Sequence, residues 1–109
     1  MLNQVVLVGR LVKDPEVEKL ESGKEIANIT LAVPRSFKNE EGVYDTDFID
    51  CVLWNSVATN TAEYCKKGDL VGIKGYLQTR EIEKYHTKFK ETRVIAEKVT
   101  FLSTKKESE

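Results

Sequence analysis

Residues 48–54 alternate along the chain in a way that strongly limits the folds open to it. Side chains of an extended strand point alternately to its two faces. One face would then carry the aliphatic row Ile49, Cys51 and Leu53, which suits a hydrophobic core. The other face would carry Phe48, Asp50, Val52 and Trp54. Because a core strand usually buries its rings, packing is the usual interpretation of a Phe or Trp in a strand, and this arrangement raises an outward stacking surface as the alternative.

Four more strands are predicted, at residues 3–13 from its β-rich composition, at 27–33 and 70–79 from the same period-two alternation, and at 92–102 as the last strand. Gly9 marks a bend or bulge in the first of them. A short extra segment at residues 17–20 follows the turn signal Asp14-Pro15 and is closed by residues 22–24. The inward positions of the strands at 27–33 and 70–79 are Ala27, Ile29, Leu31, Val33, Val71, Ile73 and Leu77.

Residues 56–67 change to helical spacing and predict one short helix. Ser56 is its expected N-cap, Lys66 and Lys67 fall in its last turn, and Gly68 takes the position after its end. Residues 35–46 are expected to form a polar loop, and the charged residues 81–91 a hairpin loop.

Three strands, a helix and two strands in this order predict an all-β OB-fold, a five-stranded Greek-key barrel with one short helix. An SH3-like barrel would lack the helix, and a ferredoxin-like fold would need a helix after the first strand. We expect the domain to occupy residues 1–103, with a short polar tail at residues 104–109.

The 109 residues are enough for one domain with a core. No apolar run approaches the roughly 20 residues of a membrane span, and no signal peptide is expected. Cys51 and Cys65 make neither a disulfide framework nor a metal spacing, so the expected location is a reducing cytoplasm. The net charge of −1 disfavours a phosphate-binding protein, but residues 74–90 carry five cations against two acids.

The sequence does not favour an enzyme, a cofactor or a metal. The single histidine, His86, has no nucleophile near it in the sequence and is expected to be a solvated loop residue. Asp45, Asp47 and Asp50 lack the spacing of a calcium loop.

Single-stranded nucleic acid needs flat side chains for its bases and cations for its phosphates. Phe48 and Trp54 lie on one face, roughly 20 Å apart at about 3.3 Å per residue. Phe37, between Arg35 and Lys38, is expected to close over a strand from a mobile loop. Lys74, Tyr76 and Arg80 extend the same kind of surface along the next strand, unless Tyr76 packs in a subunit contact or Lys74 is simply solvated.

The chain resembles the bacterial single-stranded DNA-binding protein (SSB) family from residue 1 to about residue 102. The resemblance rests on residues 2–11 (LNQVVLVGRL), 13–16 (KDPE), 27–33 (ANITLAV), 47–54 (DFIDCVLW), 64–68 (YCKKG) and 75–80 (GYLQTR). It implies an OB-fold, sequence-independent binding of single-stranded DNA and a homotetramer built partly through the first strands. It also implies stacking roles for Phe37, Phe48 and Trp54, and a basic role for Lys67 after the helix.

The chain departs from the family pattern at two places. The family's fourth stacking position falls on Ile82, which has no ring, and Tyr85 is the candidate to replace it. Members of the family continue into a flexible linker and an acidic tip that recruits replication and repair proteins, whereas this sequence stops at Glu109. The chain therefore resembles a tail-less or truncated member.

The leading hypothesis is binding and protection of single-stranded DNA during replication, recombination or repair. Two alternatives remain at this point. A primosomal-type OB adaptor would act mainly through protein contacts at the replication fork, and an RNA-binding OB domain would also use the 2′-hydroxyl.

Overall fold

The computed structural model describes residues 1–104 of the chain. The predicted polar tail, apart from Thr104, lies outside the described residues. The elements in chain order are β1 (Val5–Leu11), β2 (Val17–Lys19), β3 (Glu25–Lys38), β4 (Tyr44–Trp54), α1 (Asn55–Tyr64), β5 (Leu70–Lys84) and β6 (Thr87–Ser103).

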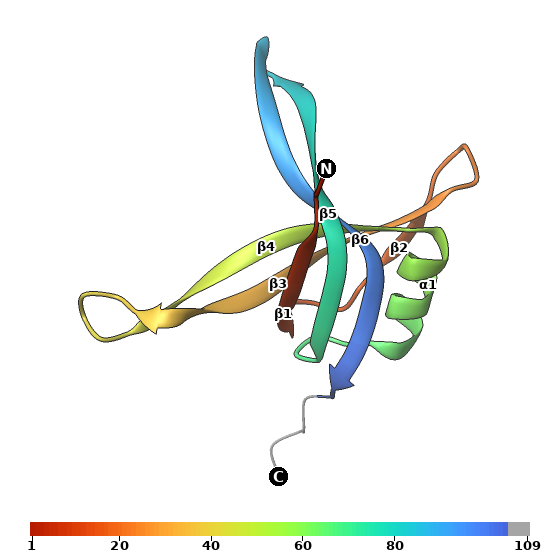
Figure 1. Cartoon of the computed structure of the whole chain (residues 1–109). Coiled ribbons are helices and arrows are strands. Elements are labelled where there is room, and N and C mark those ends of the chain that lie inside the picture. Colours follow the sequence, from red (N-terminus) through yellow and green to blue (C-terminus); the bar gives the residue numbers. More distant parts are fainter. Residues whose placement is uncertain (105–109) are drawn as a thin grey trace.

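The strands form a closed barrel, with α1 packed at one side (Figure 1). Their order is β1-β5-β6-β4-β3-β2, and β1 closes the barrel by pairing with β3 at Arg10 and Leu11. The β4–β6 pair is parallel and short, whereas the other pairs are antiparallel. β2 adds only a three-residue hairpin partner to β3. Five strands therefore make the barrel, and the predicted OB-fold is confirmed.

The core follows the predicted period of two. Leu31 of β3 and Leu53 of β4 are fully buried, and Ile73 of β5 packs with them. The other members of this cluster are Leu11, Ala27, Ile29, Cys51, Ala58, Cys65, Val71, Val94 and Ala96. Each buried large aliphatic side chain stabilises the fold by about 1.5–3 kcal/mol, so these inward rows hold the barrel and leave the outer faces free for other residues.

One predicted side-chain orientation is wrong, and one outward side chain is more buried than its position suggests. Leu77, expected in the core, is 47% exposed, because it lies on β5 beyond the irregularity in the β5–β6 pairing at Lys74 and Gly75. Val52 lies on the outer face opposite Asn28, as expected, but it is only 4% exposed. Its parallel pairing partner in β6 is Ile95, which is also buried, so the base of the outer face is apolar where β4 and β6 meet.

The helix is shorter than predicted, and its caps differ. It begins at Asn55 directly after β4, with Trp54 at the N-cap position and no side-chain cap, so Ser56 is not the N-cap. The Asn55 side chain instead accepts a hydrogen bond from the Glu25 backbone N–H. The helix ends before Cys65, so Lys66 and Lys67 lie in the following loop, where Gly68 has a φ of +90°.

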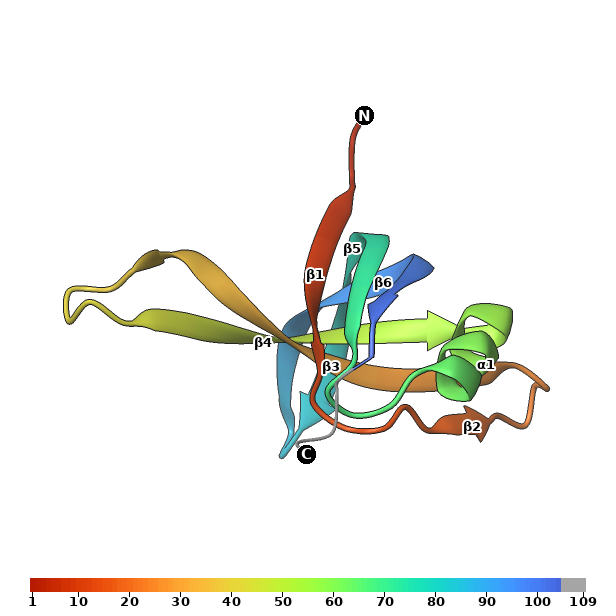
Figure 2. The same ribbon diagram turned by 90° about the horizontal axis from the view of Figure 1, so that it is seen from below.

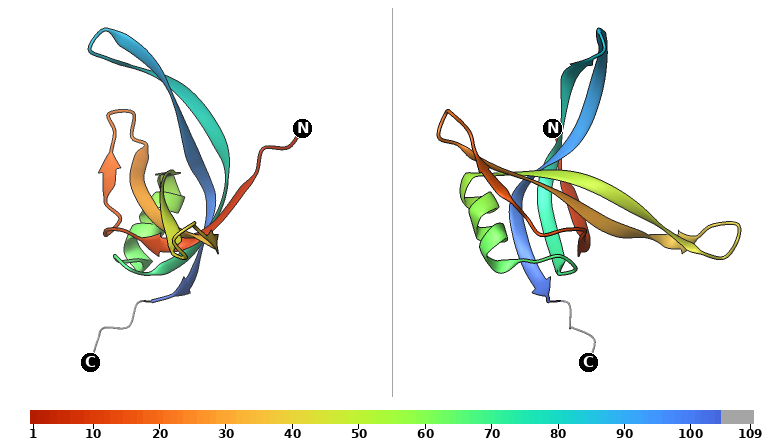
Figure 3. Two further views of the ribbon diagram at one scale, coloured as in Figure 1. Left: turned by 90° about the vertical axis from the view of Figure 1, so that its left-hand side faces the viewer. Right: turned by 180° about the vertical axis from the view of Figure 1, so that it is seen from behind.

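Two long β-ribbons leave the barrel in different directions (Figures 1 and 2). β3 and β4 continue through most of the predicted loop at 35–46, leaving only residues 39–43 as its turn. β5 and β6 likewise continue through residues 81–91 and turn at Tyr85 and His86. The view from behind shows both ribbons standing clear of the barrel (Figure 3, right). Their side chains face solvent on both sides, so they lack the apolar alternation that reveals a strand in the sequence.

Candidate functional site

The outer face of β3 and β4 presents the two predicted rings beside small or polar partners. Going along the strands, the facing pairs are Ala32 with Phe48, Thr30 with Asp50, Asn28 with Val52, and Ile26 with Trp54. Phe48 is 67% exposed, since the methyl group of its cross-strand neighbour is too small to cover it. Trp54 is half-buried beside the larger Ile26. Neither ring is sealed inside the barrel, so both have surface available for stacking.

A groove of about 300 Å³ lies between this outer face and the root of the β5–β6 ribbon. Its lining residues are Lys13, Asn28, Ile29, Thr30, Asp50, Val52, Arg80, Glu91 and Arg93. A second depression, of about 390 Å³, shares Lys13 and Asn28 with it and reaches the β2 hairpin. The two depressions adjoin at Lys13 and Asn28, and the first of them contains three cations and two acids.

Hydrogen bonds within the groove fix the direction of its charged groups. Arg80 Nε donates to Glu91 Oε2 at 2.7 Å, and Arg93 donates to Gln78 Oε1 at 3.0 Å. The Thr30 hydroxyl donates to Asp50 Oδ1 at 2.7 Å. Of these contacts, Arg80–Glu91 is an exposed ion pair, and such pairs are worth only about 0–1 kcal/mol, so a phosphate would displace Glu91 at little cost.

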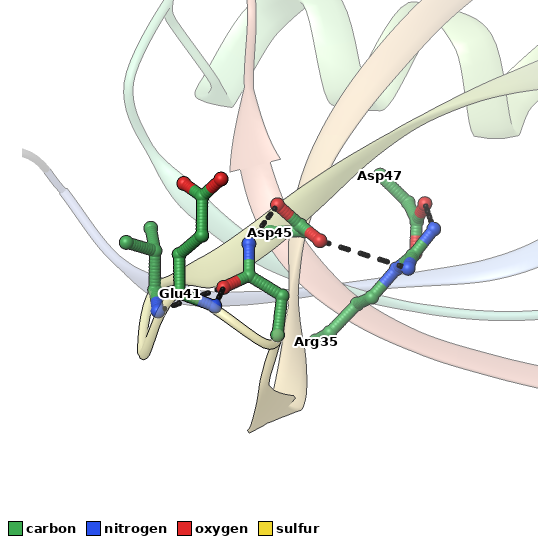
Figure 4. A network of polar contacts seen from close by, with 6 residues as sticks. Arg35, Glu41, Asp45 and Asp47 are labelled. Atoms are coloured by element: carbon green, nitrogen blue, oxygen red, sulfur yellow. Dashed lines mark hydrogen bonds and ion pairs between the residues drawn. The ribbon is translucent and has the colours of Figure 1, made fainter.

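The β3–β4 ribbon holds Arg35 in a polar network of its own (Figure 4). Its guanidinium donates two hydrogen bonds to Asp47, of 3.0 and 3.1 Å, and lies 3.9 Å from Asp45. The hydrogen bond from Arg35 holds the pKa of the Asp47 carboxyl below its ordinary value, and the carboxylate raises the pKa of Arg35. Two of the five guanidinium N–H groups of Arg35 are therefore engaged with Asp47, which fixes the direction of this side chain.

Phe37 lies where the pairing of β3 with β4 becomes irregular, between Pro34 and Lys38. It is 67% exposed. The Lys38 ammonium lies 5.7 Å from the centre of the Tyr44 ring across the ribbon, within range of a cation–π interaction. The ribbon thus carries an open ring and a nearby cation, as predicted, but on a β-ribbon rather than in a loop.

Three of the predicted contact residues lie apart from the groove. Lys67 is in the α1–β5 loop, where its backbone N–H donates to Asp14 Oδ1 at 2.7 Å. Lys74 is exposed on β5 between Val6 of β1 and Lys98 of β6. Tyr76 is half-buried across from Ile95. None of the three is among the residues lining the groove.

Two of the cations that do line the groove, Lys13 and Arg93, were not singled out from the sequence. Arg93 reaches the groove because β6 pairs with β5 residue by residue, with Arg93 opposite Gln78 and Glu91 opposite Arg80. From the sequence, the face on which Arg93 lies follows only from counting alternate residues back from the hairpin turn. Tyr85 and His86 are not typical turn residues, so the sequence does not mark where that turn lies.

The described residues offer little for covalent or metal chemistry. Burial raises the pKa of the Cys51 thiol to about 12, and burial also raises that of Cys65, so neither forms a ready thiolate. Within residues 1–104, no group of three or more His, Cys, Asp or Glu side chains is placed to hold a metal ion. The same part of the chain contains no helix that is long and apolar enough to cross a membrane.

Comparison with known proteins extends over almost the whole chain. Residues 2–102 match the model of the Single-strand binding protein family. Single-stranded DNA-binding protein B of Bacillus subtilis is 47% identical over 106 residues, which cover 96% of this chain and 94% of that protein. Single-stranded DNA-binding protein A of the same organism is 49% identical over 106 residues, covering 96% of this chain and 62% of that protein.

These relatives differ in how much of their own length the match covers. The single-stranded DNA-binding protein of Oceanobacillus iheyensis is 47% identical over 106 residues, which cover 96% of this chain and 66% of that protein. The chain spans nearly the whole of one of these three relatives and about two thirds or less of the other two.

Proposed function

Because the chain belongs to the single-strand binding protein family, we propose that it binds single-stranded DNA independently of base sequence. Coating of this kind protects unwound strands during replication, recombination or repair. The observation that carries the proposal is the outer face of β3 and β4, where two accessible rings lie beside a groove containing three cations.

In the proposed complex, bases stack on Phe37, Phe48 and Trp54. Each stacked base contributes roughly 1–3 kcal/mol, and every base has a flat face, so the contact does not select a sequence. The phosphates would follow the groove cations Lys13, Arg80 and Arg93, with Lys38 on the β3–β4 ribbon. Contacts from Arg35, Lys67, Lys74 and Tyr76 stay predictions.

We further propose a homotetramer, as the family resemblance implies. The support is β1, which pairs with β5 along Val5–Arg10 but with β3 only at Arg10 and Leu11. Its exposed Val6 and Val8 lie beside an edge that a second copy can extend. Light scattering of the free protein measures this assembly directly.

The proposed role is binding without catalysis and without a cofactor, in the cytoplasm at the nucleoid, where single-stranded DNA arises in bacteria. The family match and the names of the relatives support it. The adaptor alternative finds no support in these comparisons.

Quenching of Trp54 fluorescence by oligo-dT tests the proposal. Trp54 is the single tryptophan, and a base stacked on its exposed part is expected to quench its emission. The affinity should fall as salt rises, since phosphate contacts release counterions. A matched oligo-U is the control: tighter binding to RNA, or the absence of any quench by oligo-dT at low salt, would contradict the proposal.

A further inference from the structure

The β5–β6 ribbon has a fixed register that assigns its side chains to two faces. The strands turn through Tyr85 and His86, with φ values of 52° and 63°, which suit a two-residue hairpin turn. Lys84 then pairs with Thr87, and the pairing continues without a shift down to Gln78 and Arg93. Because facing residues in antiparallel strands share a side of the sheet, the register places every side chain of the ribbon on one face or the other.

One face of the ribbon consists of opposite charges. Glu81 faces Lys90, and Glu83 faces Lys88, so the four side chains form two complementary cross-strand pairs. The other face carries Arg80 opposite Glu91 and, two residues farther out, Ile82 opposite Phe89. This second face is the one with an apolar and aromatic pair at its centre.

The face with Ile82 and Phe89 is also the face that borders the groove. Arg80, Glu91 and Arg93 line the groove together with residues of β3 and β4. Phe89 is two residues from Glu91 on the same strand, so by strand alternation its ring projects on the groove side of the ribbon. The ring is 50% exposed, whereas Ile82 is half-buried.

We propose that Phe89 is a further base-stacking residue of this protein, with Ile82 supporting its ring from the facing strand. The proposal rests on the proposed function, since it extends the path of the single strand from Phe48 onto the β5–β6 ribbon. The ring of Phe89 lies opposite Ile82, the position at which the family pattern has its fourth stacking residue and this chain has no ring. Arg80 and Arg93, on the same face, lie where the phosphates flanking the stacked base would pass.

Tyr85 is less suited to this role, although it is 96% exposed. Tyr85 lies in the hairpin turn, after the end of β5 at Lys84. The last paired residues of the ribbon are Lys84 and Thr87, so Tyr85 has no residue facing it across the strands. An aromatic residue opposite a β-branched one is a favourable pair that holds the ring in place, and Phe89 has such a partner.

The experiment compares Phe89→Leu and Phe89→Trp with the control Tyr85→Asn by fluorescence anisotropy of labelled oligo-dT. Leucine keeps an apolar side chain next to Ile82 but removes the flat face, so Phe89→Leu is expected to weaken binding roughly 5- to 150-fold. Phe89→Trp should retain or improve affinity. Asparagine tolerates the positive φ at position 85, so Tyr85→Asn removes the exposed ring without straining the turn and should leave affinity unchanged.

The two proposals fail in different ways. Wild-type affinity for Phe89→Leu, in a protein that binds oligo-dT, overturns the role of Phe89 and leaves the proposed function standing. Loss of binding in Tyr85→Asn but not in Phe89→Leu assigns the ring of this ribbon to Tyr85 and overturns the role of Phe89 as well. Failure of the wild-type protein to bind oligo-dT instead contradicts the proposed function.

Discussion

A Phe37→Ala/Phe48→Ala double variant is expected to bind oligo-dT at least roughly 30-fold, and at most on the order of 10⁴-fold, more weakly than the wild-type protein. Each ring offers an exposed face to one base, and two lost stacks of roughly 1–3 kcal/mol each add if the sites are independent. Both rings are 67% exposed and neither belongs to the core cluster, so the barrel should remain folded. Anisotropy of labelled oligo-dT measures the loss.

Tyr64→Ala is the matched control for this variant. Tyr64 is also an exposed ring, but it lies on α1 against Phe101, with a centroid distance of 5.7 Å, and it does not line the groove. Its removal should leave DNA affinity unchanged. Equal affinities of the double variant and the wild-type protein, or a loss confined to Tyr64→Ala, would place the binding surface elsewhere.

Gly75→Ala is expected to destabilise the fold by at least about 3 kcal/mol. An added Cβ at this position would lie 2.0 Å from the Ile95 carbonyl oxygen and 2.9 Å from its carbon. Both atoms belong to the backbone of β6, where the β5–β6 pairing is irregular, so the clash cannot be relieved by moving a side chain. With total stabilities of about 5–15 kcal/mol for domains of this kind, the loss is a large share.

Gly72→Ala on the same strand is the control, because its added Cβ would meet Leu102 Cδ1 at an ordinary 3.6 Å. Urea unfolding followed by Trp54 fluorescence should show a much lower midpoint for Gly75→Ala and a nearly unchanged one for Gly72→Ala. The melting temperature should fall by about 4–8 °C for each kcal/mol lost. Similar midpoints for the two variants would show that the close approach of β5 to β6 at Gly75 is not required.

The parts of the fold that the sequence predicts well are those with one packed face. The inward residues Ala27, Ile29 and Leu31 of β3 and Cys51 and Leu53 of β4 are buried as expected. Where one face of a strand packs on the core, every second side chain has to be apolar, and the sequence shows this period. The ribbons are missed for the opposite reason. Residues 35–38 and all of 80–84 except Ile82 are exposed, so their strands are held mainly by backbone pairing that leaves no apolar period in the sequence.

The sequence predicts those features of the candidate site that follow from the alternation of a single strand. It does not predict the features that follow from how two strands pair. The exposure of Phe48 follows from its position in a single alternating segment. The engagement of Arg35 with Asp47 requires the pairing of β3 with β4, and the presence of Arg93 in the groove requires the register of β5 with β6. Both registers depend on turns, at residues 39–43 and 85–86, whose geometry the sequence alone does not specify.

Ultraviolet cross-linking of the wild-type protein to oligo-dT, with the linked residues located by mass spectrometry, tests most directly where the strand lies. We expect the cross-links to fall on Phe37, Phe48, Trp54 and Phe89, none of which is sealed in the core. Cross-links confined to Tyr64 and Phe101, beside α1, would show that DNA follows the opposite side of the molecule and would contradict the proposed surface.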